Sequence, residues 1–180
     1  MPEEIEVRAV LNALKDAYHE RNLAKLDHAM DLFDEDEQIE MIGIGAYQRN
    51  GLEWFVGHDR IREIIAGDWE YWGNVEMDVN GAQIHVHGEI AWVSMTAILL
   101  QSNAFEKALP QYREQMETLL NEAGADPKIA MLNAAFYGMG RLRDSIKPVG
   151  EGWPMVITLV LIKRKQGWKF HTLHWSVPAE

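Results

Sequence analysis

The stretch that decides the fold is PMVITLVLIKRKQGWKFHTLHWSV, residues 154–177. It contains two runs of mainly apolar, β-branched and aromatic residues, 154–165 and 168–177, on either side of Gln166-Gly167. A short glycine turn between two such runs predicts an antiparallel β-hairpin. Successive side chains of a strand point to opposite faces, so the second run should have two distinct faces. One face would hold Trp168, Phe170, Thr172, His174 and Ser176, and the other Lys169, His171, Leu173 and Trp175.

The rest of the chain predicts helices at the N-terminus and further strands in the middle. Apolar residues recur at helical spacing in the first thirty residues and again after His58. Residues 75–101 contain β-rich runs separated by glycine turns, which predicts two or three antiparallel strands. Helical spacing then returns in residues 102–152. A helical hairpin inserted in a sheet connection of this length is typical of a lid or an interface arm.

Composition and charge exclude several function classes. The 180 residues include no cysteine, which excludes disulfides, thiolate metal sites and thiol nucleophiles. The formal net charge is −11 and no basic stripe is present, so we expect no nucleic-acid partner. The acidic N-terminus lacks the pattern of a secretory signal, and no window approaches 18 apolar residues. We therefore expect a cytoplasmic protein without a membrane partner.

Three stretches carry a resemblance to a known family. They are LEWFVGHDRIREII (52–65), VHGEIAWVS (86–94) and GWKFHTLHWS (167–176). They resemble the Glu-Trp-x-x-Gly helix start, the Gly-acid-x-Ala-Trp strand and the final strand ending in His-x-Ser of the SnoaL-like branch of the nuclear transport factor 2-like superfamily, near the ketosteroid isomerases. The resemblance covers residues 7–101 and 153–178, and the helical hairpin departs from it.

The resemblance implies an α+β fold in which a curved antiparallel sheet wraps around the N-terminal helices as a cone-shaped α+β barrel. Residues 1–180 would form one SnoaL-like domain with a helical-hairpin insertion at about 102–152. Such a cone has a pocket for a small-molecule ligand at one end. Residues 155–162 and the pair Leu173 and Trp175 make the last strands apolar on both faces. We therefore expect a homodimer through the outer sheet face, which is frequent in this family.

The family pattern places its terminal His-x-Ser inside the cone, which assigns His174 and Ser176 to the pocket. A histidine exchanges protons near neutral pH, so His174 is the first candidate for a catalytic proton carrier. Glu53 and Asp68 are its candidate carboxylate partners, because an apolar cone disfavours the charged form of a carboxyl. The alternative is that His174 is a hydrogen-bonded core residue, that Glu53 caps or pairs at the surface, and that Asp68 faces solvent.

Further side chains are expected to contact the substrate. They are Tyr47, Trp54, Trp69, Trp72, Trp92, Phe170, Thr172 and Ser176. His85 and His87 share a strand face, but no adjacent third ligand supports a metal site. Arg141 and Arg143 of the inserted helix can clamp an acidic ligand or lie on an exposed helix face. No phosphate-binding glycine motif is present, and we expect no cofactor.

Two functions fit these observations. The first is an acid–base enzyme without a cofactor, of the isomerase, cyclase or dehydratase type, acting on a small apolar organic substrate. The second is a non-catalytic ligand-binding or oligomeric assembly module. A fold alone does not decide between them, because this architecture hosts both.

Overall fold

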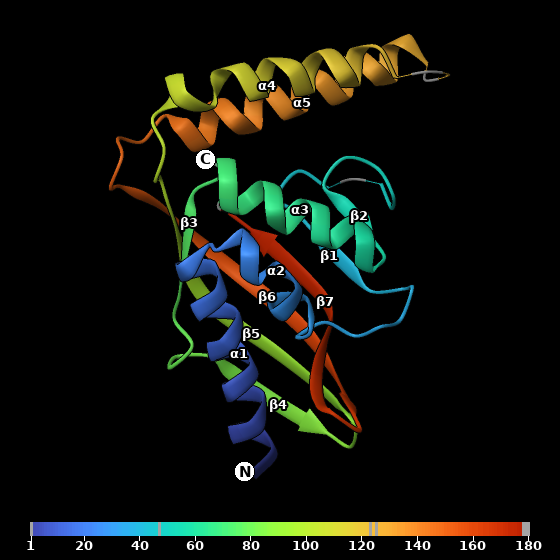
Figure 1. The fold of residues 1–180 in the computed structure, drawn as a ribbon, viewed down its shortest axis with the longest axis vertical. Helices are drawn as coiled ribbons and strands as arrows, with labels where there is room; N and C mark the ends of the chain where they lie inside the picture. The colour runs from blue at the N-terminus through green and yellow to red at the C-terminus, as the bar shows by residue number, and fades with distance from the viewer. Residues whose placement is uncertain (1, 47, 123, 125, 178–180) are drawn as a thin grey trace.

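The protein is built around a seven-stranded sheet (Figure 1). The computed structural model describes residues 2–46, 48–122, 124 and 126–177. The strands are β1 (Glu40–Ile42), β2 (Trp54–Val56), β3 (Asn74–Met77), β4 (Gln83–His87), β5 (Ile90–Leu100), β6 (Gly152–Arg164) and β7 (Gly167–Ser176). They follow the order β2-β1-β7-β6-β5-β3, with β4 also paired to β5.

The predicted α+β class is confirmed, with two refinements of the sheet. β1 runs parallel to β7, whereas the other pairings between the described strands are antiparallel, so the sheet is mixed. The strand order begins at β2 and ends at β3 without a pairing between them, so the curved sheet stays open rather than closing into a barrel.

Helices cover one face of the sheet (Figure 1). They are α1 (Pro2–Glu20), α2 (Leu26–Met30), which follows the 3-10 turn Leu23–Lys25, and α3 (His58–Tyr71). The buried side chains of α1 follow the spacing of one helix face and are Val7, Leu11, Leu14 and Tyr18. Each such buried side chain contributes roughly 1.5–3 kcal/mol to stability. α1 packs on β3, β4 and β7, and this places the core between the helices and the sheet.

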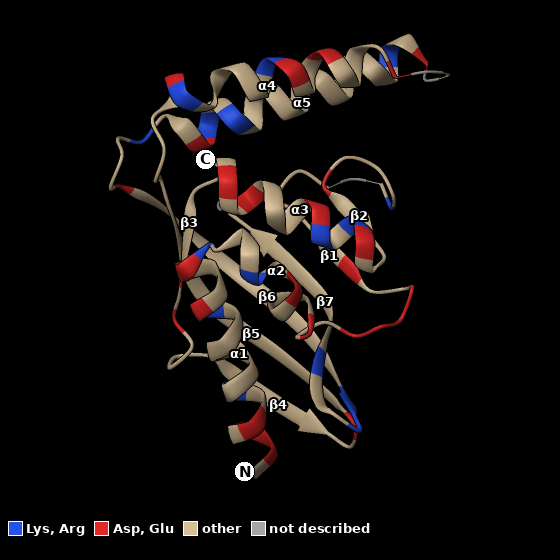
Figure 2. Ribbon diagram, in the orientation of Figure 1, with Lys and Arg blue, Asp and Glu red and all other residues tan. Residues whose placement is uncertain are grey.

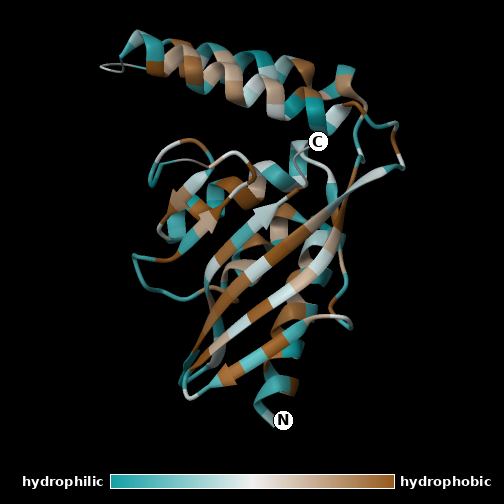
Figure 3. Ribbon diagram, turned by 180° about the vertical axis from the view of Figure 1, so that it is seen from behind, coloured by the Kyte–Doolittle hydropathy of each residue, from teal (hydrophilic) through white to brown (hydrophobic). Residues whose placement is uncertain are grey.

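The opposite, outer face of the sheet is open to solvent in this chain (Figure 3). β5 alternates strictly between buried and exposed positions, and Ile90, Trp92 and Ile98 are among its exposed side chains. Trp92 is 49% exposed and its ring stacks on His85 with 5.4 Å between centroids. The prediction that Trp92 lines the pocket is therefore wrong, because its position in the alternation points it outward.

β7 contains a β-bulge that changes which side chains face the core. Its pairing with β6 jumps from Thr172 to Phe170, so His171 is an extra residue in the ladder. The buried side chains before and after the bulge are Trp168, Phe170, Leu173 and Trp175. The predicted alternation through the whole strand is wrong for this reason. Thr172 and His174 lie on the outer face instead of facing the pocket.

A helical hairpin stands between β5 and β6 and lies across one end of the sheet and α3 (Figure 1). Its helices are α4 (Phe105–Leu120) and α5 (Pro127–Ser145). Asp126 caps α5 by accepting the backbone N–H of Lys128 at 2.8 Å, and Pro127 occupies the first turn. The two helices bury Ala108 and Tyr112 against Ala130 and Ala134. Within the described ranges, every helix is too short or too polar to cross a membrane.

Candidate functional site

A hollow of about 620 Å³ lies between the cone and the helical hairpin. The segment between β1 and β2, together with α3 and β7, forms its lower wall, and the hairpin forms its upper wall. The residues on which its chemistry depends are Glu53, Asp68, Trp72 and Trp175 of the cone and Tyr112, Asn133, Tyr137 and Arg141 of the hairpin. Aromatic walls with a few convergent polar groups are typical of a small-molecule site.

Asp68 is the titratable group of the pocket whose environment is most unusual. It interrupts the apolar side of α3, and the buried Tyr18 of α1 donates its hydroxyl to Asp68 Oδ2 at 3.4 Å. Burial raises the pKa of Asp68 from 3.8 to about 7, and the nearby Glu53 carboxylate acts in the same direction. The positive charge of Arg141 opposes this rise in pKa without cancelling it. Asp68 can therefore both hold and release a proton at neutral pH.

Tyr18 keeps its proton and so remains a hydrogen-bond donor. Burial raises the pKa of its phenol well above 10.0, and the adjacent Asp68 raises it further. Because the Tyr18 ring also packs edge-on against Trp69, with 6.2 Å between centroids, the hydroxyl is fixed in place. Tyr18 is thus a positioning residue for the Asp68 carboxyl.

Glu53 is held by backbone contacts made possible by glycine. The backbone N–H of Gly45 donates to Glu53 Oε2 at 2.7 Å, and the N–H of Gly43 donates to the Glu53 carbonyl at 2.6 Å. A Cβ on Gly43 would lie 2.9 Å from the Glu53 side chain, so this close approach requires glycine. Glu53 itself has a φ of 59°, a conformation that non-glycine residues seldom adopt. Such a conformation persists where surrounding contacts enforce it.

Arg141 brings a positive charge from α5 to the pocket. Its Nη2 lies 3.4 Å from Glu53 Oε1 and 3.3 Å from Asp144 Oδ2, and its guanidinium lies 5.4 Å from the centre of the Tyr137 ring. Burial alone lowers the pKa of Arg141, but the carboxylates of Asp144 and Glu53 outweigh it and the net direction is upward. Its Nε–H is buried and has no hydrogen-bond partner among the described residues.

Asp144 fastens α5 to the end of α3. It is buried, and Trp72 Nε1 donates to its Oδ2 at 3.1 Å. Arg143 donates to its other oxygen through Nε at 3.0 Å and Nη2 at 2.6 Å. A buried carboxylate with this many donors is a fixed anchor. The hairpin therefore meets the cone through two charged contacts, at Asp144 and at Arg141.

The structure brings together only part of the predicted site. Glu53, Asp68 and Trp72 all line the pocket. His174 is exposed on the outer face, where its Nδ1 lies 3.5 Å from Thr158 Oγ1. Trp54, Trp69, Phe170 and Thr172 do not line the pocket; Trp69 and Phe170 belong to the core. Tyr47 lies outside the described residues.

Several residues of the candidate site were missed by sequence reasoning, namely Tyr18, which contacts Asp68, and two tyrosines that line the pocket. Tyr18 follows the helical spacing of an ordinary core position, and Tyr112 and Tyr137 belong to the inserted hairpin, for which the family pattern gives no guide. For Arg141 the sequence left two alternatives open, a clamp for an acidic ligand and an exposed helix face. Its i, i+4 spacing with Tyr137 on α5 was the available signal that the two share a helix face.

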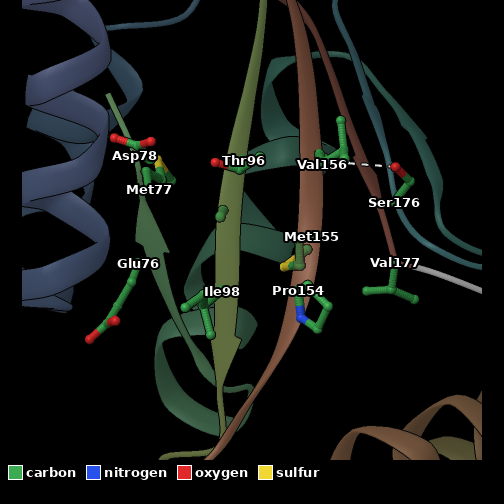
Figure 4. Close-up of a pocket in the computed structure, with 11 residues that line it drawn as sticks. Glu76, Met77, Asp78, Thr96, Ile98, Pro154, Met155, Val156, Ser176 and Val177 are labelled. Carbon is green, nitrogen blue, oxygen red and sulfur yellow. Dashed lines mark hydrogen bonds between the residues drawn. The ribbon is translucent and has the colours of Figure 1, made fainter. Parts of the chain in front are cut away.

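A second hollow, of about 720 Å³, opens on the outer face of the sheet (Figure 4). Its floor is formed by outward side chains of β5 and β6, among them Ile98 and Val156. Ser176 belongs to this hollow and not to the pocket between cone and hairpin, and its hydroxyl donates to the Val156 carbonyl at 3.3 Å. Across the described part of the chain, no three His, Asp or Glu side chains converge where they could hold a metal ion.

The fold is that of an α+β protein with a curved, open sheet covered by helices, and a hollow lies between this cone and the helical hairpin. The sequence matches the family model of the SnoaL-like domain over residues 7–110. The chain therefore belongs to the SnoaL-like domain family. A search of curated proteins finds no match to the sequence.

Solved structures share the fold at low sequence identity. A candidate dehydratase of the NTF2-like family from Streptomyces avermitilis is 13% identical, with a TM-score of 0.62 over 99% of both chains. An NTF2-like protein of unknown function from Pseudomonas putida KT2440 is 12% identical, with a TM-score of 0.57 over 98% of this chain and 87% of its own. One from Shewanella oneidensis MR-1 is 15% identical, with a TM-score of 0.55 over 98% and 99%. At these identities the similarity shows the fold alone.

Proposed function

We propose that this protein is an acid–base enzyme of the isomerase or dehydratase type, with Asp68 as the proton carrier. Its substrate is a small, neutral, largely apolar organic molecule that carries a carbonyl group. Asp68 takes the role that the sequence had suggested for His174, because Asp68 borders the pocket and His174 does not.

The observation that carries this proposal is the contact of Asp68 with Tyr18 at the pocket wall. The Tyr18 hydroxyl orients the Asp68 carboxyl by donating to Oδ2, and the other carboxyl oxygen, Oδ1, is left for the substrate. A carboxyl that titrates near neutral pH is well matched to proton transfer, since the product of correct protonation state and driving force is largest there. The environment of Asp68 raises its pKa into that range through burial.

The chemistry requires only the residues of this chain. The Asp68 carboxylate removes a proton from the carbon next to the substrate carbonyl, and the C–H electron pair moves to give an enolate. The guanidinium of Arg141 stabilises the negative charge on the enolate oxygen. In a β,γ-unsaturated substrate the enolate is conjugated, and Asp68 returns the proton to the γ-carbon as the double bond moves to the α,β position, which is an isomerisation. In a β-hydroxy substrate Asp68 gives the proton to the hydroxyl, which leaves as water as the α,β double bond forms, which is a dehydration. Glu53 positions Arg141 through their ion pair.

The likeness to the candidate dehydratase of Streptomyces avermitilis is consistent with this reaction type. At 13% identity this likeness supports the fold only. The cytoplasmic location and the lack of a cofactor stay predictions.

Deuterium exchange into simple ketones tests the proposal and does not require the natural substrate. Neutral cyclic ketones and β-hydroxy ketones are incubated with the protein in D₂O, and proton NMR follows exchange at the α-carbon and loss of water. We expect turnover with the wild type and a loss of about 10²–10⁴-fold in Asp68→Asn. His174→Ala serves as the matched control and should retain activity. Turnover that survives in Asp68→Asn would overturn the proposal.

The same assay separates the alternative function. If ligands quench the fluorescence of Trp72 and Trp175 but no exchange or dehydration occurs, the pocket belongs to a non-catalytic binding module. An enzyme requires both binding and a turnover that depends on Asp68.

We also propose a homodimer through the outer sheet face. Ile90, Trp92, Ile98 and Val156 are 44–50% exposed there, and two of them, Ile98 and Val156, line the hollow shown in Figure 4. Large apolar side chains exposed on one sheet face favour protein association. Trp92→Glu should halve the mass measured by sedimentation, and an unchanged mass in a folded variant would contradict this interface.

A further inference from the structure

The helix α5 has one face packed into the protein and an opposite, apolar face. One face contacts α4 and the pocket through Ala130, Ala134, Tyr137 and Arg141. The opposite face is directed to solvent, and its large apolar side chains are 42–74% exposed. These are Met131, Leu132, Met139, Leu142 and Ile146, the residue that follows the helix. A row of exposed apolar side chains of this size on a helix marks a contact surface.

The exposed side chains of α5 form a continuous seam. Leu132, Ala135, Met139, Leu142 and Ile146 follow one another at alternating intervals of three and four residues. This spacing is the pattern of helices that pair along their length. We call these five residues the α5 seam. All five residues are exposed, whereas Ala134 and Asp144, which lie between them in the sequence, are buried. The seam therefore faces outward.

The neighbouring helix α4 offers no comparable surface. Its outward side chains are largely charged and include Lys107, Arg113, Glu114 and Glu117, all of which are exposed. Figure 2 shows these charges along α4, whereas much of α5 is uncharged. The apolar surface of the hairpin is therefore concentrated on one helix.

The area of this surface is comparable to one side of a small protein–protein interface. Together with Met131, the seam exposes on the order of 600 Å² of apolar surface, at the upper end of the largest patch on a typical monomer. A standard protein–protein interface buries about 800 Å² per partner, which the seam approaches before flanking residues are counted.

The charge distribution favours a second copy of the same chain as the occupant. Residues 102–152 carry seven acidic and six basic side chains, a net charge of −1, so the remaining residues carry −10 of the total −11. Because the hairpin is nearly neutral, two hairpins meet with little local charge repulsion. A seam of uniform apolar residues is also self-complementary, as a two-fold interface requires.

We propose that the α5 seam is a homotypic docking surface on which α5 of a second copy packs about a two-fold axis. The proposal goes beyond the function assigned to the pocket and is independent of the outer-face dimer. Because the other side of α5 carries Tyr137 and Arg141, the partner copy would hold the roof of the pocket in place. A chain with both two-fold surfaces would assemble as a tetramer.

Single-thiol crosslinking tests the contact directly, because the natural chain has no cysteine. Met139 lies in the middle of the seam, where a residue comes close to its own counterpart across a two-fold axis. Full-length Met139→Cys should form a covalent dimer under mild oxidation with copper phenanthroline. Ile5→Cys, at an exposed position of α1, is the matched control and should not. Equal crosslinking of the two variants would overturn the proposal.

Sedimentation velocity gives a second, independent measurement. The double variant Met139→Glu and Leu142→Glu should have half the mass of the wild type at about 50 µM, with circular dichroism unchanged. Ile5→Glu should keep the wild-type mass. A wild type that sediments at 20.6 kDa, or a folded double variant with the wild-type mass, would overturn the α5 interface. A mass that falls only in Trp92→Glu would support the outer-face dimer and overturn the α5 seam, whereas loss of turnover in Asp68→Asn bears on neither.

Discussion

The guanidinium of Arg141 lies 3.4 Å from the carboxylate of Glu53, a residue 88 positions away in the sequence. Arg141 belongs to the inserted hairpin, and Glu53 precedes β2 in the cone. Their side chains are only 16% and 19% exposed, so the pair is screened less by solvent than a surface ion pair. The hairpin is thus part of the pocket itself, whose lining comes both from the cone and from α4 and α5.

The stability of the protein should depend on the ionisation of Asp68. Burial raises the pKa of its carboxyl from 3.8 to about 7. A carboxyl with a raised pKa in the folded state destabilises that state when ionised, so the penalty is absent below about pH 4 and complete above about pH 7. We expect Asp68→Asn to be more stable than the wild type by roughly 1–3 kcal/mol at pH 8 and to have no such advantage at pH 4. Urea unfolding at both pH values measures this, and a pH-independent difference would contradict it.

The two charges beside Asp68 should shift its titration in opposite directions. The Glu53 carboxylate raises the pKa of Asp68 and the Arg141 guanidinium lowers it. Glu53→Gln should therefore lower the pKa of Asp68, and Arg141→Met should raise it. Carbon-13 NMR of the labelled aspartate carboxyls follows both titrations. Arg113→Met, on the exposed face of α4, is the control, and a shift of the same size there would mean that the effect is not local.

Much of the fold could be predicted from the sequence, because the hairpin at 154–177 and the helical spacing around Leu11 and Leu14 report burial directly. The bulge at His171 could not be predicted. A bulge leaves no mark in the composition of a strand, but the residues that follow it point to the opposite face from the one that simple alternation predicts. The bulge at His171 is the reason that His174 lies on the outer face and not in the pocket as predicted.

The candidate site could be predicted only where a local sequence pattern points to it. Asp68 could be found because a carboxylate interrupts an apolar helix stripe, and Glu53 because it precedes the helix in the family pattern. Arg141 could not be placed, since the packing of an inserted hairpin onto a cone depends on tertiary contacts that no local pattern encodes. Its partner Asp144 is buried for the same reason.

Substitutions on β7 should follow the bulge and not the simple alternation. His174 is exposed on the outer face, so His174→Leu should change the free energy of unfolding by less than about 0.5 kcal/mol. Leu173 is fully buried, so Leu173→Ala should cost about 2–5 kcal/mol. Urea unfolding of the two variants measures both values. A large loss in His174→Leu together with a small loss in Leu173→Ala would show that the faces are assigned the wrong way round.

The close approach of Gly43 to Glu53 should make this glycine irreplaceable. A Cβ at Gly43 would meet the Glu53 side chain at 2.9 Å, so Gly43→Ala must displace the carboxylate from Gly45 and Arg141. We expect a loss of about 1–3 kcal/mol in stability and, because Glu53 moves, an altered pKa of Asp68 in the same NMR titration. Gly140→Ala is the matched control: no atom lies within 4 Å of the added Cβ, and alanine in a helix should stabilise by about 0.5–1 kcal/mol. Gly43→Ala with wild-type stability and an unmoved Asp68 titration would mean that the loop tolerates a Cβ and that Glu53 is not held by this contact.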